Sequence, residues 1–254
     1  MPVRSLLATL ILVVGTTPLL AQQGELRAIV PVVGSTAGAH GSNFKTSLQL
    51  YNRSVREMRG SLVIRPAGAT SDAENRSLPY VLAPHQTVGF EDIVASAGIT
   101  GLGSLDFLVE QGGVPTIVAR AYNDGGETGT TGVSVPPLAL KDAVNAGQMG
   151  VLIVPADLMR FRFNIGVRTL GDGARIMVRL YDANGTIRAT PGQMTFAPHS
   201  FTQQPASQLL GGQELAANQS IGFEVLEGAA IFYGTSTDNL TNDPSLQIAR
   251  GDEE

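Results

Sequence analysis

The 254-residue sequence contains no cysteine and no tryptophan, and only 15% of its residues are charged. The absence of cysteine excludes disulfides, thiolate metal ligands and a cysteine nucleophile. Acidic residues number 22 against 17 basic ones, so the chain has no positive excess with which to bind nucleic acid. Its hydrophobic content of 43% excludes the disordered class and allows a large core.

Long hydrophobic runs are also scarce, and the longest lies at the start of the chain. Residues 1–21 combine a basic Arg4, an apolar run and a small residue, Ala21, before Gln22. This pattern is typical of a cleaved secretory signal, and residues 15–18 interrupt the run too early for a membrane anchor. No later segment is long enough to span a membrane. We therefore expect an exported mature chain that is periplasmic, cell-surface or extracellular.

Four short motifs recur in the same order about 115 residues apart, which is the mark of an internal repeat. The matching segments are residues 29–31 and 153–155, 44–50 and 161–167, 83–85 and 197–199, and 104–109 and 220–225. The repeat predicts two domains, residues 22–138 and 150–250, each enclosing its own core. Residues 139–149 form the predicted linker, and residues 251–254 a frayed acidic tail.

Within each predicted domain the apolar residues alternate with polar ones, the period of a half-buried strand. Phe44, Leu48 and Leu50 share one face of such a segment, and Leu105 and Phe107 share a face of another, with Asp106 on the opposite side. Turn signals separate these segments; Asn184-Gly185, for example, favours a type I′ hairpin turn. Short helical turns are expected at residues 91–97 and 205–210. The sequence predicts an all-β chain of two immunoglobulin-like antiparallel β-sandwich domains.

The order of these motifs resembles a family of exported bacterial β-sandwich repeats, which often occur in pairs in secreted and cell-surface proteins. The second unit carries the resemblance through residues 161–164, 178–185 and 236–244, and the first through residues 30–31, 46–50 and 120–123. The resemblance covers nearly the whole mature chain. It implies the fold and an exported location, and it implies no activity, because the family has no established catalytic residues.

Catalytic signatures are missing from the sequence. There is no Gly-x-Ser-x-Gly elbow, no His-Glu-x-x-His zinc helix and no phosphate-binding glycine loop. We expect a non-enzymatic protein. The alternative is a hydrolase that uses carboxylates brought together by folding, such as Glu91, Asp92 or Asp106.

The most polar segments are two loops at equivalent places in the repeat, and they are the candidate binding sites. Their oxygen-bearing side chains are Asn123, Asp124, Glu127, Asp238, Asn239, Asn242 and Asp243. Calcium prefers six to eight oxygen ligands of these kinds, so Ca²⁺ is a candidate ligand here. Turn formation explains the same composition, because Asn and Asp side chains bond their own backbone. The longer loop of the first unit, residues 34–43, is a third candidate.

Histidine and arginine give weaker signals. His85 and His199 are repeat-equivalent, so we expect both to serve in the same kind of turn, with the ring bonded to a carbonyl; His40 lies in a loop. The arginines alternate along strands, which predicts that several share an exposed face able to meet an acidic polymer or simply to be solvated. They are Arg53, Arg56, Arg59, Arg65, Arg160, Arg162, Arg168, Arg175 and Arg179.

Together these patterns favour a secreted or cell-surface binding module with a structural or adhesive role. Its expected partners are a cell-envelope glycan or another surface protein, bound through the loops or an exposed sheet. A carbohydrate-binding module, or an accessory domain of a hydrolase, is the alternative. The lack of tryptophan and the presence of only five tyrosines disfavour aromatic sugar platforms.

Overall fold

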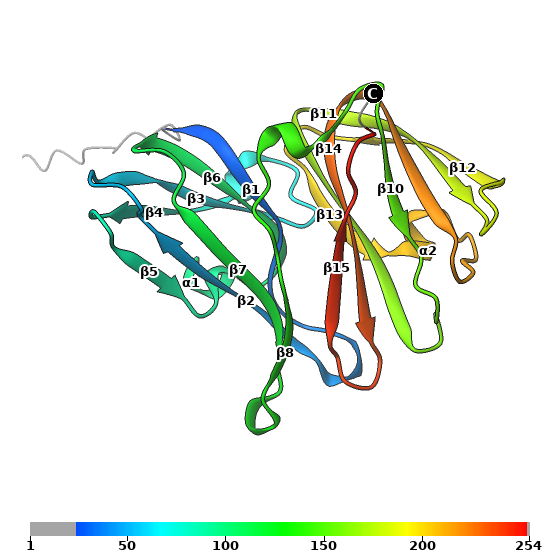
Figure 1. The fold of residues 1–254 in the computed structure, drawn as a ribbon, viewed down its shortest axis with the longest axis horizontal. Helices are drawn as coiled ribbons and strands as arrows, with labels where there is room; N and C mark the ends of the chain where they lie inside the picture. Colours follow the sequence, from blue (N-terminus) through cyan, green and yellow to red (C-terminus); the bar gives the residue numbers. More distant parts are fainter. Residues whose placement is uncertain (1–23, 253–254) are drawn as a thin grey trace, which may run out of the picture.

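A computed structural model describes residues 24–252, so the predicted signal segment, residues 1–21, lies outside the described residues. The fold is all-β, as the alternating sequence predicts, and its strands form two antiparallel sheets. Figure 1 shows these sheets side by side. We call residues 24–138 the N-terminal half and residues 144–252 the C-terminal half; the short segment between them includes a 3₁₀ turn, Leu140–Asp142.

The N-terminal half folds into two facing layers. One has the strand order β4-β3-β6-β1, and the other contains β5, β2, β7 and β8. Strand β1 belongs to both, because it pairs with β6 up to Ser35 and with β2 at Thr36 and Ala37. The elements are β1 (Glu25–Ala37), β2 (Asn43–Tyr51), β3 (Met58–Pro66), β4 (Arg76–Leu82), β5 (Thr87–Phe90), α1 (Ile93–Ser96), β6 (Gly101–Gln111), β7 (Thr116–Asp124) and β8 (Thr130–Ser134).

Two long strands, β11 and β14, organise the C-terminal half. They pair along most of their length, with a register shift between Thr169 and Ala174 that divides each strand into two parts. The first part of β11 also pairs with β13, and its second part with β12. The elements are β9 (Val144–Asn145), β10 (Met149–Ile153), β11 (Phe161–Tyr181), β12 (Ile187–Phe196), β13 (Phe201–Pro205), α2 (Ala206–Leu209), β14 (Ser220–Asp238) and β15 (Pro244–Ile248).

Local signals predict the turns and short helices well, with one correction. Helix α1 begins where Asp92 accepts the N–H groups of Val94 and Ala95, and α2 lies within the predicted residues 205–210. His85 and His199 both have positive φ angles in Ala-Pro-His turns, which confirms a shared turn role, although neither ring bonds a carbonyl among the described residues. The type I′ prediction is wrong.

The correction at the β11–β12 turn has a local cause. Of the two expected left-handed residues, only Gly185 has a positive φ. The Asp182 carboxylate accepts the backbone N–H groups of Asn184 and Thr186, both at 2.9 Å. This side chain therefore builds an Asx turn, and the glycine alone takes the left-handed position.

The hydrophobic clusters differ from the expectation that each unit encloses its own core. The C-terminal cluster contains only residues from Val144 onwards, such as Ile165, Val167 and Phe223. The N-terminal cluster also contains Phe201 and Tyr233, which come from the C-terminal half. A third, smaller cluster joins Ile29 and Leu138 to Ala143 and Ile231. The two halves therefore bury apolar surface against each other.

The predicted frayed tail also differs from the structure at its start. Gly251 forms an isolated bridge with Gly150, and the Asp252 carboxylate accepts the backbone N–H of Met149 at 2.8 Å. These contacts hold the first two tail residues against β10. Residues 253 and 254 lie outside the described part of the chain.

Tyr233 depends on a glycine opposite it. Its ring is fully buried and lies over Gly166 on the neighbouring strand, where a Cβ would overlap the ring carbons. The Tyr233 hydroxyl donates to the side-chain oxygen of Gln203 at 2.8 Å. Glycine at position 166 therefore allows the aromatic ring to pack flat between the halves.

We expect Gly166→Ala to lower the free energy of unfolding by about 2 kcal/mol, because the added methyl group overpacks a buried contact. Gly89→Ala is the matched control, since a Cβ there has no atom closer than 3.9 Å. Denaturant unfolding of both variants measures the difference. Equal stabilities would contradict the packing argument.

Candidate functional site: the cleft between the two halves

A cleft with a cavity of about 680 Å³ lies between the two halves. Strands β1, β2, β6, β7 and β8 contribute to one wall, and β11, β13, β14 and β15 to the other. A cavity of this size lies within the range of small-molecule sites, which are typically about 300–1,000 Å³. Because both halves line it, the cleft exists only when they are packed together.

The wall from the C-terminal half supplies most of the polar side chains of the cleft, and strand register fixes their order. Asn164 on β11 lies opposite Thr235 on β14, and Arg162 lies opposite Thr237. Along β11, Arg162 and Asn164 alternate with Phe163 and Ile165, which belong to the C-terminal core; Phe163 also lines the cleft.

The facing wall is apolar. Val32 of β1, Leu102 of β6 and Val133 of β8 contribute side chains to it, and Phe44 adds an aromatic ring. Lys45 also lines the cleft, but its ammonium group forms an ion pair with Asp124 at 2.6 Å. The N-terminal wall is therefore mainly apolar, and the C-terminal wall combines apolar residues such as Phe161 and Leu246 with a row of polar side chains.

Asn242 joins three segments beside the cleft. Its side-chain nitrogen donates to the carbonyl of His40 at 3.1 Å, and its side-chain oxygen accepts from the Arg162 guanidinium at 2.9 Å. The hydroxyl of Thr131, on β8, donates to the Asn242 carbonyl at 3.3 Å. The three predicted loops therefore meet at one end of the molecule, where Figure 1 shows the β7–β8 and β14–β15 hairpins.

In the first of these loops, polar side chains are mostly occupied by the loop itself. The Asn123 side-chain oxygen accepts the N–H of Asn43 at 2.7 Å. Asp124 binds Lys45 and accepts the N–H of Gly126, and both contacts lower the pKa of its carboxyl group. Glu127 is exposed in the tip of the loop.

In the second loop, Asp238 organises the turn. One carboxylate oxygen accepts the N–H groups of Leu240 and Thr241, and the other binds Arg160 at 2.7 Å. These contacts, led by the one with Arg160, lower the pKa of Asp238 to about 2.

The remaining polar residues of this loop have local partners as well. Asn239 donates its side-chain N–H to the carbonyl of Met159, and the N–H of Asp243 bonds the Thr241 hydroxyl. Across residues 24–252, no group of three or more His, Cys, Asp or Glu side chains is placed to hold a metal ion. Calcium binding at these loops stays a prediction.

The Asp238 turn predicts a pH-dependent stability. Its folded pKa of about 2 lies below the unfolded value of about 3.9, so its stabilisation is complete above the unfolded pKa and is lost as the pH falls through the folded one. We expect Asp238→Asn to be less stable than the unmodified protein at pH 7, with the difference closing between pH 4 and pH 2. Unfolding curves over this range measure it; a difference that is independent of pH would contradict the role of the charge.

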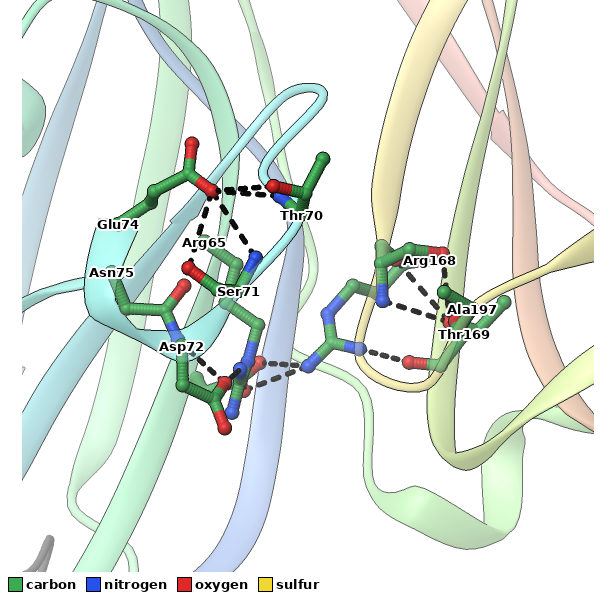
Figure 2. A network of polar contacts seen from close by, with 11 residues as sticks. Arg65, Thr70, Ser71, Asp72, Glu74, Asn75, Arg168, Thr169 and Ala197 are labelled. Atoms are coloured by element: carbon green, nitrogen blue, oxygen red, sulfur yellow. Dashed lines mark hydrogen bonds and ion pairs between the residues drawn. The ribbon is translucent and has the colours of Figure 1, made fainter.

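A buried ion cluster holds the halves together beyond the cleft. Asp106 on β6 and Arg168 on β11 are both completely buried, and one Arg168 nitrogen lies 2.8 and 2.7 Å from the two Asp106 oxygens. Arg65 on β3 binds the same carboxylate and also reaches Asp72 at 2.9 Å. Figure 2 shows Arg168 extending from the C-terminal half towards Arg65 and Asp72.

Neutralisation explains why these charges tolerate burial. Burial lowers the pKa of Arg168, and the negative charge of Asp106 opposes that change. His199 lies near the cluster, where burial, then Arg65 and Arg168, lower the pKa of its imidazole. A neutral His199 adds no further positive charge to the cluster.

The cluster corrects two expectations. Arg65 and Arg168 do not belong to an exposed cationic face, since Arg65 is only 7% exposed and Arg168 is fully buried. Asp106 was a candidate hydrolytic acid, but its carboxylate is enclosed by two guanidinium groups. Asp92, another candidate acid, caps α1 through its side chain.

Sequence reasoning missed both the ion cluster and the cleft. Arg168 and Asp106 are 62 residues apart and each occupies the outer face of an alternating strand, where solvent exposure is the ordinary expectation. One sequence feature could have pointed to the ion cluster. Asp106 lies between the core residues Leu105 and Phe107, whereas the matching position in the second unit is Gly222. That asymmetry separates Asp106 from the repeated pattern.

We expect Asp106→Asn to lower the free energy of unfolding by about 3–5 kcal/mol, because it leaves the buried Arg168 without its anion and Arg65 with the exposed Asp72 alone. Asp72→Asn serves as the control, since the Asp72 side chain is 79% exposed and its pairing is worth less than about 1 kcal/mol. Calorimetric or denaturant unfolding compares the two. A similar loss in both variants would contradict the dominant role of the inter-half contact.

Comparison with protein-family models and with curated proteins finds no match for this chain. Within the described residues, every helix is too short to cross a membrane. The evidence for a function therefore comes from the all-β fold and the geometry of the cleft.

Proposed function

We propose that this chain is an exported, non-enzymatic binding protein made of two repeated immunoglobulin-like β-sandwich units, with a structural or adhesive role. Its ligand site is the loop end of the cleft. The observation that carries the proposal is the meeting of loops from both halves around Asn242.

The strand order supports the repeat. The N-terminal layer β4-β3-β6-β1 corresponds in order to β12-β11-β14-β10, and the pairs β5–β2, β2–β7 and β7–β8 correspond to β13–β11, β11–β14 and β14–β15. In each half, the Ala-Pro-His turn is followed by a short strand, β5 or β13, and then by a short helix, α1 or α2. The recurring segments 44–50 and 161–167 lie in β2 and β11, and 104–109 and 220–225 lie in β6 and β14, which supports the proposed repeat.

Exposed apolar side chains support a binding role for the loop end. Met159 and Leu240 are 92% and 90% exposed, respectively. They lie on adjacent loops, because Asn239 bonds both the carbonyl of Met159 and that of Arg160. Large apolar residues that protrude together beside a cleft are typical of a contact surface.

The partners of the acidic residues support a non-enzymatic role. Asp92 caps a helix, Asp106 and Asp124 are paired with cations, and Asp238 closes a turn. Each of these carboxylates stabilises the fold at its own position. Two carboxyl groups that act as general acid and base must converge on the same substrate, and these four serve separate parts of the structure.

A screen of immobilised cell-envelope glycans and surface proteins tests the proposal. We expect the purified protein to bind a component of the envelope, and the double substitution Met159→Ser, Leu240→Ser to weaken that binding at least tenfold. The matched control is Val55→Ser. Val55 is also a highly exposed apolar residue (78%), and it lies beyond the opposite end of β2.

The outcomes separate the candidate surfaces. Binding lost in the double variant and kept in Val55→Ser supports the loop end, and a glycan hit supports the carbohydrate-binding alternative. Binding that both variants retain would contradict the assignment to this surface. Absence of any envelope ligand would contradict the adhesive role.

A further inference from the structure

Arg162 places a positive charge in the cleft, and no carboxylate oxygen of residues 24–252 bonds to it, although the charge of Asp238 opposes the effect of burial on its pKa. Among residues 24–252, the acceptors that contact Arg162 are neutral: the carbonyl of Asp238 and the side-chain oxygens of Asn239 and Asn242. These three contacts leave two of the five guanidinium N–H bonds without an acceptor in the described chain. The Asp238 carboxylate instead binds Arg160 and accepts the backbone N–H of Leu240 in its own turn.

The position of this charge favours an anion. Burial lowers the pKa of Arg162, so the cleft has removed part of the water that solvates the guanidinium group. A partly desolvated cation with free N–H bonds is stabilised by an anionic group that replaces the lost water. The other cation of the cleft, Lys45, already has Asp124 as its partner.

Further hydrogen-bonding groups lie next to Arg162 on the same wall. The Thr237 hydroxyl is directly across the strand pair from Arg162, and Asn164 and Thr235 form the next row inwards. None of these three side chains donates or accepts a hydrogen bond within the described residues. Together they offer donors to a carboxylate held at Arg162.

The rest of the cleft suits an apolar body. Phe44, Val133 and Leu102 face this polar row, and Leu246 borders it. The part of β11 that lines the cavity runs from Phe161 to Asn164, a rise of about 10 Å along this wall. Such a cleft has one place for a charge and a longer hydrophobic surface beside it.

We propose that the cleft binds an amphipathic carboxylate of the fatty-acid class, with its carboxylate at Arg162 and its hydrocarbon chain against the apolar wall. This inference rests on the proposed binding function, whose ligand chemistry it specifies. The exposed Met159 and Leu240 flank the same end of the cleft and extend its apolar surface outwards.

Calorimetric titration with dodecanoate, below its critical micelle concentration, tests the proposal against dodecan-1-ol as the uncharged probe. We expect saturable 1:1 binding of dodecanoate and affinity for the alcohol that is about ten- to a hundredfold lower, the usual range for a charge-assisted hydrogen bond. Arg162→Gln should remove this preference. Arg120→Gln, a substitution of the same kind outside the cavity lining, should preserve it.

A second variant keeps the test valid if Arg162→Gln proves unstable. Thr237→Val removes one donor beside the charge and should lower dodecanoate affinity several-fold while leaving the alcohol unaffected. Val133→Trp fills the apolar wall and should weaken both probes.

Three results would overturn the inference: no saturable binding of dodecanoate, equal affinity for the alcohol, or binding that persists unchanged in Val133→Trp. If envelope binding still depends on Met159 and Leu240 in any of these cases, the proposed function stands and only the ligand class is wrong. Loss of both activities would contradict the proposed function as well.

Discussion

Asp106 is excluded from water, and the two arginines that neutralise it come from different halves of the chain. This shared carboxylate is the constraint on which the arrangement of the two halves depends. If the halves separated, Asp106 would keep Arg65, but Arg168 would have to be solvated again or remain without its anion, and a buried unpaired charge is costly. The contact therefore favours one relative placement of the two halves.

Hydrophobic packing reinforces the same placement. Phe201 and Tyr233 complete the N-terminal core, and Ile29 and Ile231 belong to the cluster between the halves. The ion cluster adds directional contacts to this non-directional packing, because guanidinium and carboxylate groups bond only in specific geometries. Tyr233 fits because Gly166 leaves space for its ring.

The fixed placement has a consequence for binding. The walls of the cleft belong to different halves, so their separation is set by contacts outside the cleft. A preformed cavity costs a ligand less ordering free energy than one that must be assembled on binding. Asn242 ties the loops at the open end in the same way, through bonds to His40 and Arg162. The structure thus combines a rigid cleft with exposed apolar residues at its rim.

The sequence by itself determined the all-β class, the short helices and most turns, because alternation, capping residues and positive-φ turn residues act over a few neighbours. Asp92 at the start of α1 is an example, and the Asp182 turn is an exception in which one side chain changed the turn type. The sequence also drew attention to the loops that meet at Asn242.

Only the tertiary structure decided what the outer faces of the strands contact. Alternation distinguishes the two faces of a strand but does not say whether the polar face meets water or another sheet. A charged side chain can be stabilised in either place, by water or by an opposite charge. Asp106 and Arg168 look like ordinary exposed residues until packing brings them together across 62 positions. Arg162 shares their alternating pattern, yet it lines the cleft because the N-terminal half lies across from it and supplies no carboxylate that bonds to it.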